Sequence, residues 1–249
     1  MNINELKQVS KEILEVTSTL ITGPNYRTTK FQKVLECIAR KDFLKLYSVA
    51  YLAGDPFNAD SVLDLSRSML EDMISVEFMK LKGREKMASK FINYMIIELK
   101  MDKDFLLSLG SSPNGKLVEG LENDFKKIQK KFIFKSGQIA RSWAKCSIED
   151  MIRQLLTKGI INAKDRETIL QTYILGNRKN HLSPIDVLSY ASQSVRESNQ
   201  DGSLSVGFTI AITCYFKIVM EFAGEMNRKQ IINDLENIWN KMKPIYIVK

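Results

Sequence analysis

The chain has 249 residues, of which 37 are basic and 29 acidic, giving a formal net charge of +8. This length suits one large or two small domains that bury roughly three quarters of the unfolded surface. Twelve glycines and five prolines are too few for an all-β chain, because closely spaced turns require these residues. The positive charge permits attraction to RNA or acidic partners, although an ordinary basic surface explains it equally well.

The residues that usually bind metals are scarce. The chain contains one histidine, His181, and three widely separated cysteines, Cys37, Cys146 and Cys214. Their odd number and wide spacing predict buried, reduced thiols of a cytoplasmic protein. This composition excludes an ordinary zinc site and a His–Asp metal centre, so we expect no metal and no cofactor. The nearest approach to a membrane span is the uncharged run 204–216, whose length suits a core helix, and we expect no membrane association.

Apolar residues recur at helical spacing almost throughout the chain. Caps and Gly/Pro breaks divide the pattern into successive helices. We predict helices over residues 3–22, 31–51, 58–81, 84–99 and beyond, 117–132, 147–159, 162–175, 184–199, and two more after Gly202, of which the second carries Ile231 to Trp239.

These segments predict an all-α fold, a single multi-helix bundle. Residues 1–57 are expected to form N-terminal helices that pack on a helical core domain of residues 58–243, and residues 244–249 an irregular tail. The loop 110–115 is the best candidate for a linker. Its Gly/Lys spacing imitates a phosphate-binding P-loop, but Leu117 replaces the required Ser or Thr, and an ordinary connection explains it better.

The helix 58–81 is apolar around most of its circumference, which predicts a central position in the bundle. Arg67 falls within one of its apolar stripes. A buried guanidinium needs an anionic partner, and Glu71, one turn later, is the nearest candidate. The pair has two interpretations. It is either an internal ion pair that fixes helix register, or Arg67 is kept desolvated to bind phosphate.

His181 is the most informative residue for chemistry. It follows Arg178 and precedes Ser183 and Pro184, which are typical of a helix N-cap and first helical residue. An imidazole there can accept the proton of an RNA 2′-hydroxyl while an arginine stabilises the phosphate, without a metal. Arg141 is a further candidate guanidinium. A twofold dimer would bring a second His181 as the acid, whereas the alternative is a histidine that only hydrogen-bonds nearby backbone.

The lysines of residues 126–131 occupy one helix face, which is usually solvated but could follow a phosphate backbone. A Cys–His nucleophile pair formed by His181 with Cys146 or Cys214 is a weaker alternative, because neither cysteine lies in a clearly electropositive segment.

Two blocks resemble a widespread bacterial all-helical family of unknown function. The first is 65–71, with Arg67 and Glu71, and the second begins at Trp143 and continues to Tyr173 and His181. The likeness covers roughly residues 60–190. The plan of that family is in turn similar to HEPN domains, many of which are metal-independent RNases of toxin–antitoxin and antiphage systems.

The HEPN resemblance implies a catalytic His181 with an arginine ahead of it. In the ribonuclease hypothesis Arg178 holds phosphate, and Arg67 supplies a second guanidinium from another helix. Asn177 matches the polar position of the motif loosely, and Arg178 stands three residues before His181, closer than the motif places its arginine. Residues expected to bind substrate or support the site are Asn177, Tyr173, Glu71, Trp143 and Arg141.

Two hypotheses follow for the function. In the first, the protein is a cytoplasmic, homodimeric, HEPN-like endoribonuclease of a toxin or antiphage defence system, with RNA as substrate and a cognate antitoxin or defence-system protein as partner. In the second, it is a non-catalytic helical binding or scaffold module, in which Arg67, Glu71, Trp143, Tyr173 and His181 form a buried structural cluster.

Overall fold

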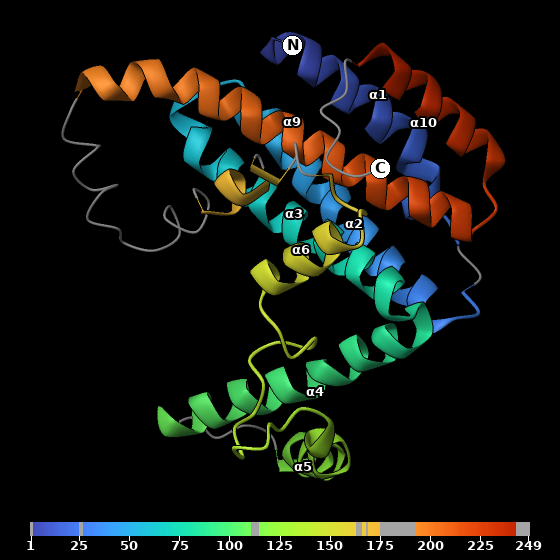
Figure 1. Ribbon diagram of the computed structural model, residues 1–249, viewed down its shortest axis with the longest axis vertical. Helices are drawn as coiled ribbons and strands as arrows, with labels where there is room; N and C mark the ends of the chain where they lie inside the picture. The colour runs from blue at the N-terminus through green and yellow to red at the C-terminus, as the bar shows by residue number, and fades with distance from the viewer. Residues whose placement is uncertain are drawn as a thin grey trace.

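The computed structural model describes residues 2–24, 27–110, 115–162, 166–167, 169–174 and 193–242. Over these ranges the regular elements are all helices, joined by turns and loops that include one isolated β-bridge between Ile133 and Ile139, so the all-α prediction is confirmed. The helices form one bundle (Figure 1). They are α1 (Ile3–Thr22), α2 (Lys30–Leu52), α3 (Ala59–Lys82), α4 (Arg84–Ser108), α5 (Gly115–Ile128), α6 (Ile148–Thr157), α9 (Gln193–Glu225) and α10 (Lys229–Lys241), with short 3₁₀ turns at Pro56–Asn58 and Gln129–Lys131.

Helix α9 is the central helix of the bundle. It runs beside α3 and α2 along much of its length and also contacts α1 and α10 (Figure 1). Its stretch Gly202–Glu225 is long and apolar enough to cross a membrane by length and composition, but 67% of its most apolar part is buried inside the protein. Buried residues from α1, α2, α3 and α9 belong to one hydrophobic core, so this apolar stretch serves as a core helix.

The closest approach between α9 and α3 depends on Gly207. A Cβ atom at this position would lie 3.2 Å from Val62 Cγ1 and 3.3 Å from Leu63 Cδ2. The buried Ser66 hydroxyl donates a hydrogen bond of 2.7 Å to the carbonyl oxygen of Gly207. The missing side chain therefore lets the two helices approach closely enough for a side chain of α3 to bond the backbone of α9.

Helix starts follow the capping rules at α1, α2 and α6. Ser147 and Asp150 form the predicted capping box of α6, and α1 begins with a second box formed by Asn2 and Glu5. Asn58 precedes α3 as predicted, but its side chain makes no cap hydrogen bond. Its Nδ2 instead donates to the carbonyl oxygen of Leu52, which ties the turn to the end of α2.

The predicted break at residues 199–202 was wrong, because α9 continues through it from Gln193 to Glu225. A glycine inside a helix costs about 1 kcal/mol relative to alanine. Leu204, Phe208 and Ile212, which follow within three turns, are fully or almost fully buried. Burial of each such side chain contributes about 1.5–3 kcal/mol, so tertiary packing outweighs the local preference of Gly202.

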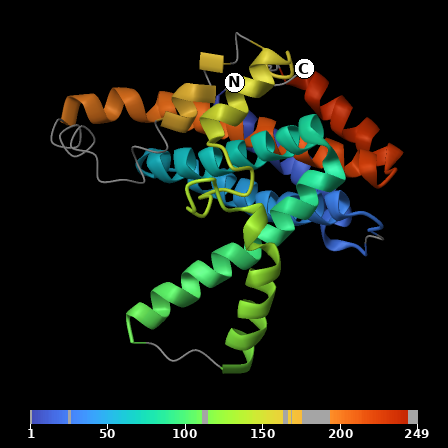
Figure 2. The same cartoon turned by 60° about the horizontal axis from the view of Figure 1, so that its bottom comes forward.

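Helices α4 and α5 form a hairpin that stands off from the rest of the bundle (Figure 2). Glu122 of α5 accepts a hydrogen bond from Lys103 of α4, and Lys100 Nζ lies 3.5 Å from the same carboxylate. Lys100 also lies over the ring of Phe125, 5.5 Å from its centroid. Where the hairpin joins the bundle, the Tyr94 hydroxyl donates to the carbonyl oxygen of Ala140. The two helices are thus held to each other, while α4 leaves another face uncovered.

Candidate functional site

Three of the predicted site residues, His181, Arg178 and Asn177, lie outside the described residues. The predicted helix entrance at Ser183 and Pro184 lies outside them as well. The catalytic roles assigned to His181 and Arg178 therefore stay predictions. The structure describes the other candidate residues, which are Arg67, Glu71, Arg141, Trp143 and Tyr173.

Arg67 lies in α3, where its side chain is only 16% exposed. Its Nε is 3.5 Å from Glu71 Oε1, so the expected ion pair is present, and 3.9 Å from Asp64 Oδ1. Burial raises the pKa of Glu71, and the Arg67 charge opposes that shift without cancelling it. Arg67 thus lies between two carboxylates of its own helix, a setting that disfavours a phosphate ligand.

A second set of charges, which sequence reasoning missed, adjoins this pair. We call Asp42, Lys45, Ser68 and Asp72, together with Lys41, the α2–α3 charge cluster. Lys45 Nζ lies 2.8 Å from Asp72 Oδ2, 2.7 Å from Ser68 Oγ and 3.2 Å from Asp42 Oδ1. The half-exposed Lys41 also bonds Asp72, at 2.6 Å. One largely buried ammonium therefore bridges carboxylates from two helices.

Asp42 is the most deeply buried charged group of this cluster, with a side chain that is 0% exposed. Burial raises the pKa of Asp42 well above its ordinary value, and the neighbouring Asp72 carboxylate raises it further, while Lys45 opposes both effects. For Lys45, burial alone would lower the pKa, but the charges of Asp42 and Asp72 outweigh it and raise the pKa. The Asp42 carboxyl therefore keeps its proton to a higher pH than an ordinary aspartic acid does.

Asp42→Asn is expected to change how stability depends on pH. Because the folded-state pKa of Asp42 is raised, its favourable contribution is complete below the ordinary value of about 3.9. That contribution is lost as the pH rises through the folded pKa. Asparagine does not titrate, so the unfolding free energy of Asp42→Asn minus that of the wild type should become more positive as the pH rises above about 4. Urea denaturation of both proteins at a series of pH values measures this difference. A difference that does not change with pH would contradict the raised pKa of Asp42.

Sequence signals for Asp42 were available. It occupies a position on α2 between Leu35, Ala39, Leu46 and Val49, all of which are buried. A charged residue at that spacing on an apolar stripe indicates a buried ion pair, by the same reasoning that singled out Arg67.

Trp143 does not join Arg67 in a common site. Its ring makes edge-on contacts with Phe78, at 6.2 Å between centroids, and with Phe91, at 5.4 Å. Phe78 lies eleven residues beyond Arg67 on α3, a separation of about 16 Å along a helix at 1.5 Å per residue. Arg141, two residues before Trp143, is exposed. These residues therefore do not converge with Arg67.

Tyr173 lies in the helical residues 169–174 and is partly buried. The predicted helix 162–175 is helical over the parts that the structure describes, 166–167 and 169–174. Tyr173 takes part in at least one polar or ring contact, which agrees with a supporting role in packing as readily as with one in binding.

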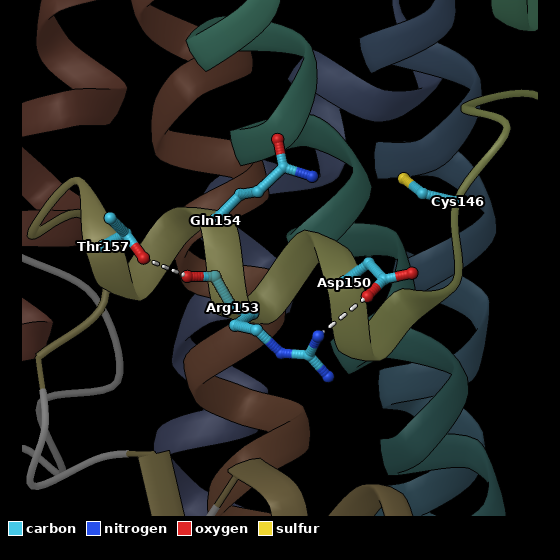
Figure 3. A pocket seen from close by; sticks show the side chains of 5 residues that line it. All are labelled: Cys146, Asp150, Arg153, Gln154 and Thr157. Atoms are coloured by element: carbon cyan, nitrogen blue, oxygen red, sulfur yellow. Dashed lines mark hydrogen bonds and ion pairs between the residues drawn. The ribbon is translucent and has the colours of Figure 1, made fainter.

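Neither Cys146 nor Cys214 is an activated nucleophile. Cys146 lines a shallow hollow of about 340 Å³ with Asp150, Arg153, Gln154 and Thr157 (Figure 3). Burial, followed by the charge of Asp150, raises the pKa of the Cys146 thiol. Burial also raises the pKa of Cys214 well above its ordinary value. Since the thiolate is the reactive form, both groups are poorly suited to nucleophilic catalysis.

The prediction that all three cysteines are buried was wrong for Cys37, which is exposed, and Cys146 is only half-buried. Cys37 stands on α2 between the buried residues Glu36 and Ile38, and its position in the turn faces outward. The general tendency of cysteine to be buried therefore gave the wrong prediction for Cys37.

A second hollow, of about 450 Å³, lies between α3 and the C-terminal part of α9. Lys80 Nζ is 3.0 Å from Glu77 and 2.7 Å from Glu221, and Arg84 Nη2 is 3.1 Å from Glu221. Its cations thus face carboxylates, and the arrangement is one of mutual neutralisation rather than of a free anion-binding site.

Comparison with known proteins gives no relative: no protein-family model, no curated protein and no solved structure matches the chain. The resemblance to HEPN domains and to the bacterial family therefore rests on the sequence blocks alone.

Proposed function

We propose that this chain is a non-catalytic helical binding module in which the Arg67 and Trp143 regions build the fold. The observation that carries the proposal is the position of Arg67, 3.5 Å from Glu71 and 3.9 Å from Asp64. An arginine that held phosphate would need its positive charge free for the ligand, and two neighbouring carboxylates repel an anion.

The exposed apolar surface also supports binding. Among the described residues, large apolar side chains are exposed along the outer half of α4, including Leu99, Phe105 and Leu109. A concentration of exposed apolar side chains on one helix is typical of interaction sites. The hairpin that carries it projects from the bundle (Figure 2), where a partner could reach it.

Arg67→Ala is expected to lower the free energy of unfolding by about 1–3 kcal/mol, because Glu71 and Asp64 lose their counter-charge in a partly buried setting. Arg153→Ala is the matched control. The Arg153 side chain is 76% exposed and pairs with Asp150 within one helix, so its loss should change stability by no more than about 0.5 kcal/mol. Chemical denaturation measures both, and equal effects would contradict a structural role for Arg67.

The binding proposal has a direct competitor in the endoribonuclease hypothesis, with an HEPN-like core, His181 as base or acid and Arg178 on phosphate. Purified protein incubated with RNA in EDTA distinguishes them. We expect no cleavage above that of His181→Ala. Cleavage in EDTA that the wild type performs and His181→Ala does not would overturn the binding proposal and establish the ribonuclease.

A further inference from the structure

The outer half of α4 carries a heptad pattern. Met95, Leu99, Asp102 and Leu106 of α4, and its C-cap residue Leu109, follow one another at intervals of four, three, four and three residues. This spacing places all five on one stripe of the helix, and it is the a/d pattern by which helices pair in coiled coils. We call these five residues the α4 heptad face.

The α4 heptad face is uncovered. The exposed fractions of its apolar members are 54% for Met95, 47% for Leu99, 45% for Leu106 and 66% for Leu109. Of the fifteen large apolar side chains exposed in the described part of the chain, seven lie between residues 95 and 109. Four of these seven are the apolar members of the α4 heptad face. Single exposed apolar residues need no explanation, but several at heptad spacing indicate a surface that another helix covers.

Helix α5 does not fill this role, because it packs on a neighbouring side of α4. The contacts between the two helices involve Lys100 and Lys103 on α4, which meet Glu122. Lys103 is buried, whereas Asp102 and Leu106 next to it are exposed. The α4 heptad face therefore lies beside the α4–α5 contact, where one further helix would complete a three-helix arrangement.

The negative charge at the centre of the α4 heptad face indicates which kind of partner can bind there. Asp102 takes a d position between two apolar layers, and Glu98 stands one turn before it. The two carboxylates repel each other, and burial together with the charge of Asp102 raises the pKa of Glu98. A second copy of the chain pairing antiparallel on this face would set Asp102 against Asp102, with further like-charge repulsion. An acidic membrane surface would be repelled by the same carboxylates.

We propose that the α4 heptad face is the docking site for one amphipathic helix of a partner protein that places a lysine or arginine opposite Asp102. The apolar layers supply the affinity, and the Asp102 pair sets the register, as a single polar residue does in coiled coils. This inference rests on the proposed binding function and names its surface and partner class.

Two synthetic helical peptides of three heptads, added to the full chain, test the proposal. Both carry leucine at the a and d positions, and they differ at the residue facing Asp102, which is lysine in one and glutamate in the other. Fluorescence anisotropy should show the lysine peptide binding roughly tenfold more tightly, and Asp102→Lys should reverse the preference. Leu106→Asp should abolish binding of both.

Leu44→Asp is the matched control, since Leu44 is an exposed leucine on α2, 65% exposed and away from the hairpin. It should leave peptide binding unchanged. Unchanged thermal melting of Leu106→Asp would show that its effect is on binding and not on folding. Failure of both peptides to bind, or equal affinity for both, overturns the proposal.

Two further measurements test the other occupants. A concentration-dependent dimer in sedimentation that Leu106→Asp dissociates would assign the face to a second copy and overturn the proposal. Binding to phosphatidylcholine vesicles, with or without phosphatidylserine, that Leu106→Asp removes would assign it to lipid and do the same. If neither peptide binds and the protein does not cleave RNA in EDTA, this inference is overturned and the proposed function stands. If the protein cleaves RNA in EDTA and His181→Ala does not, the proposed function is overturned.

Discussion

Trp143→Ala is expected to lower the free energy of unfolding by about 3–5 kcal/mol, the usual cost of removing a buried aromatic side chain. The indole is 8% exposed and lies between the rings of Phe78 on α3 and Phe91 on α4. It anchors the irregular segment before α6 to both helices. Alanine would leave a cavity at their junction. Urea denaturation followed by circular dichroism measures the loss.

Two further variants control this experiment. Trp143→Phe keeps an aromatic ring against the same partners and should lose clearly less stability than alanine. Tyr51→Ala removes an aromatic side chain that is 80% exposed, so its effect should stay within about 0.5 kcal/mol. If Trp143→Ala were no more destabilising than Tyr51→Ala, the anchoring role of the indole would be wrong.

Lys45→Ala should have a comparable effect near neutral pH, lowering the free energy of unfolding by about 3–5 kcal/mol, because it leaves buried charge without its partner. Lys45 is 15% exposed and bridges Asp42, at 0%, and Asp72, at 16%. The loss should be smaller in mild acid. Since the folded-state pKa of Asp42 is raised, its carboxyl takes up a proton as the pH falls and then needs no counter-charge.

Lys41→Ala provides the comparison, since Lys41 bonds the same Asp72 carboxylate but its side chain is 50% exposed. It should cost at most about 1 kcal/mol, as exposed ion pairs do. Denaturation of both variants at neutral and mildly acidic pH gives the result. Equal losses for the two lysines, or a Lys45→Ala loss that grows in acid, would be incompatible with the arrangement of the α2–α3 charge cluster.

Helix positions could be predicted well where local chemistry decides them. The Gly23, Gly54 and Gly83 breaks separate α1, α2, α3 and α4 as expected, because glycine and proline act on the backbone nearby. The same rule failed at Gly202, inside α9. There the buried residues that follow pack against α3 and α2, and long-range packing is invisible to a local rule.

The site was predictable only in part. The Arg67–Glu71 pair follows from helical spacing, because both residues belong to one helix. The link from Lys45 to Asp72 joins two helices, and periodicity does not say which residues of different helices meet. The same limit applies to Trp143, whose aromatic partners on α3 and α4 could not be derived from its sequence neighbours.

The contact between α1 and α9 has a consequence for biosynthesis. The Thr17 hydroxyl lies 2.9 Å from the Tyr215 hydroxyl, across 198 residues of sequence, in the buried interior. A ribosome therefore exposes the apolar sides of α1, α2 and α3 well before it has made the helix that covers them. Closure of the interior must therefore wait until α9 has been made, and apolar surface left uncovered during that interval favours aggregation.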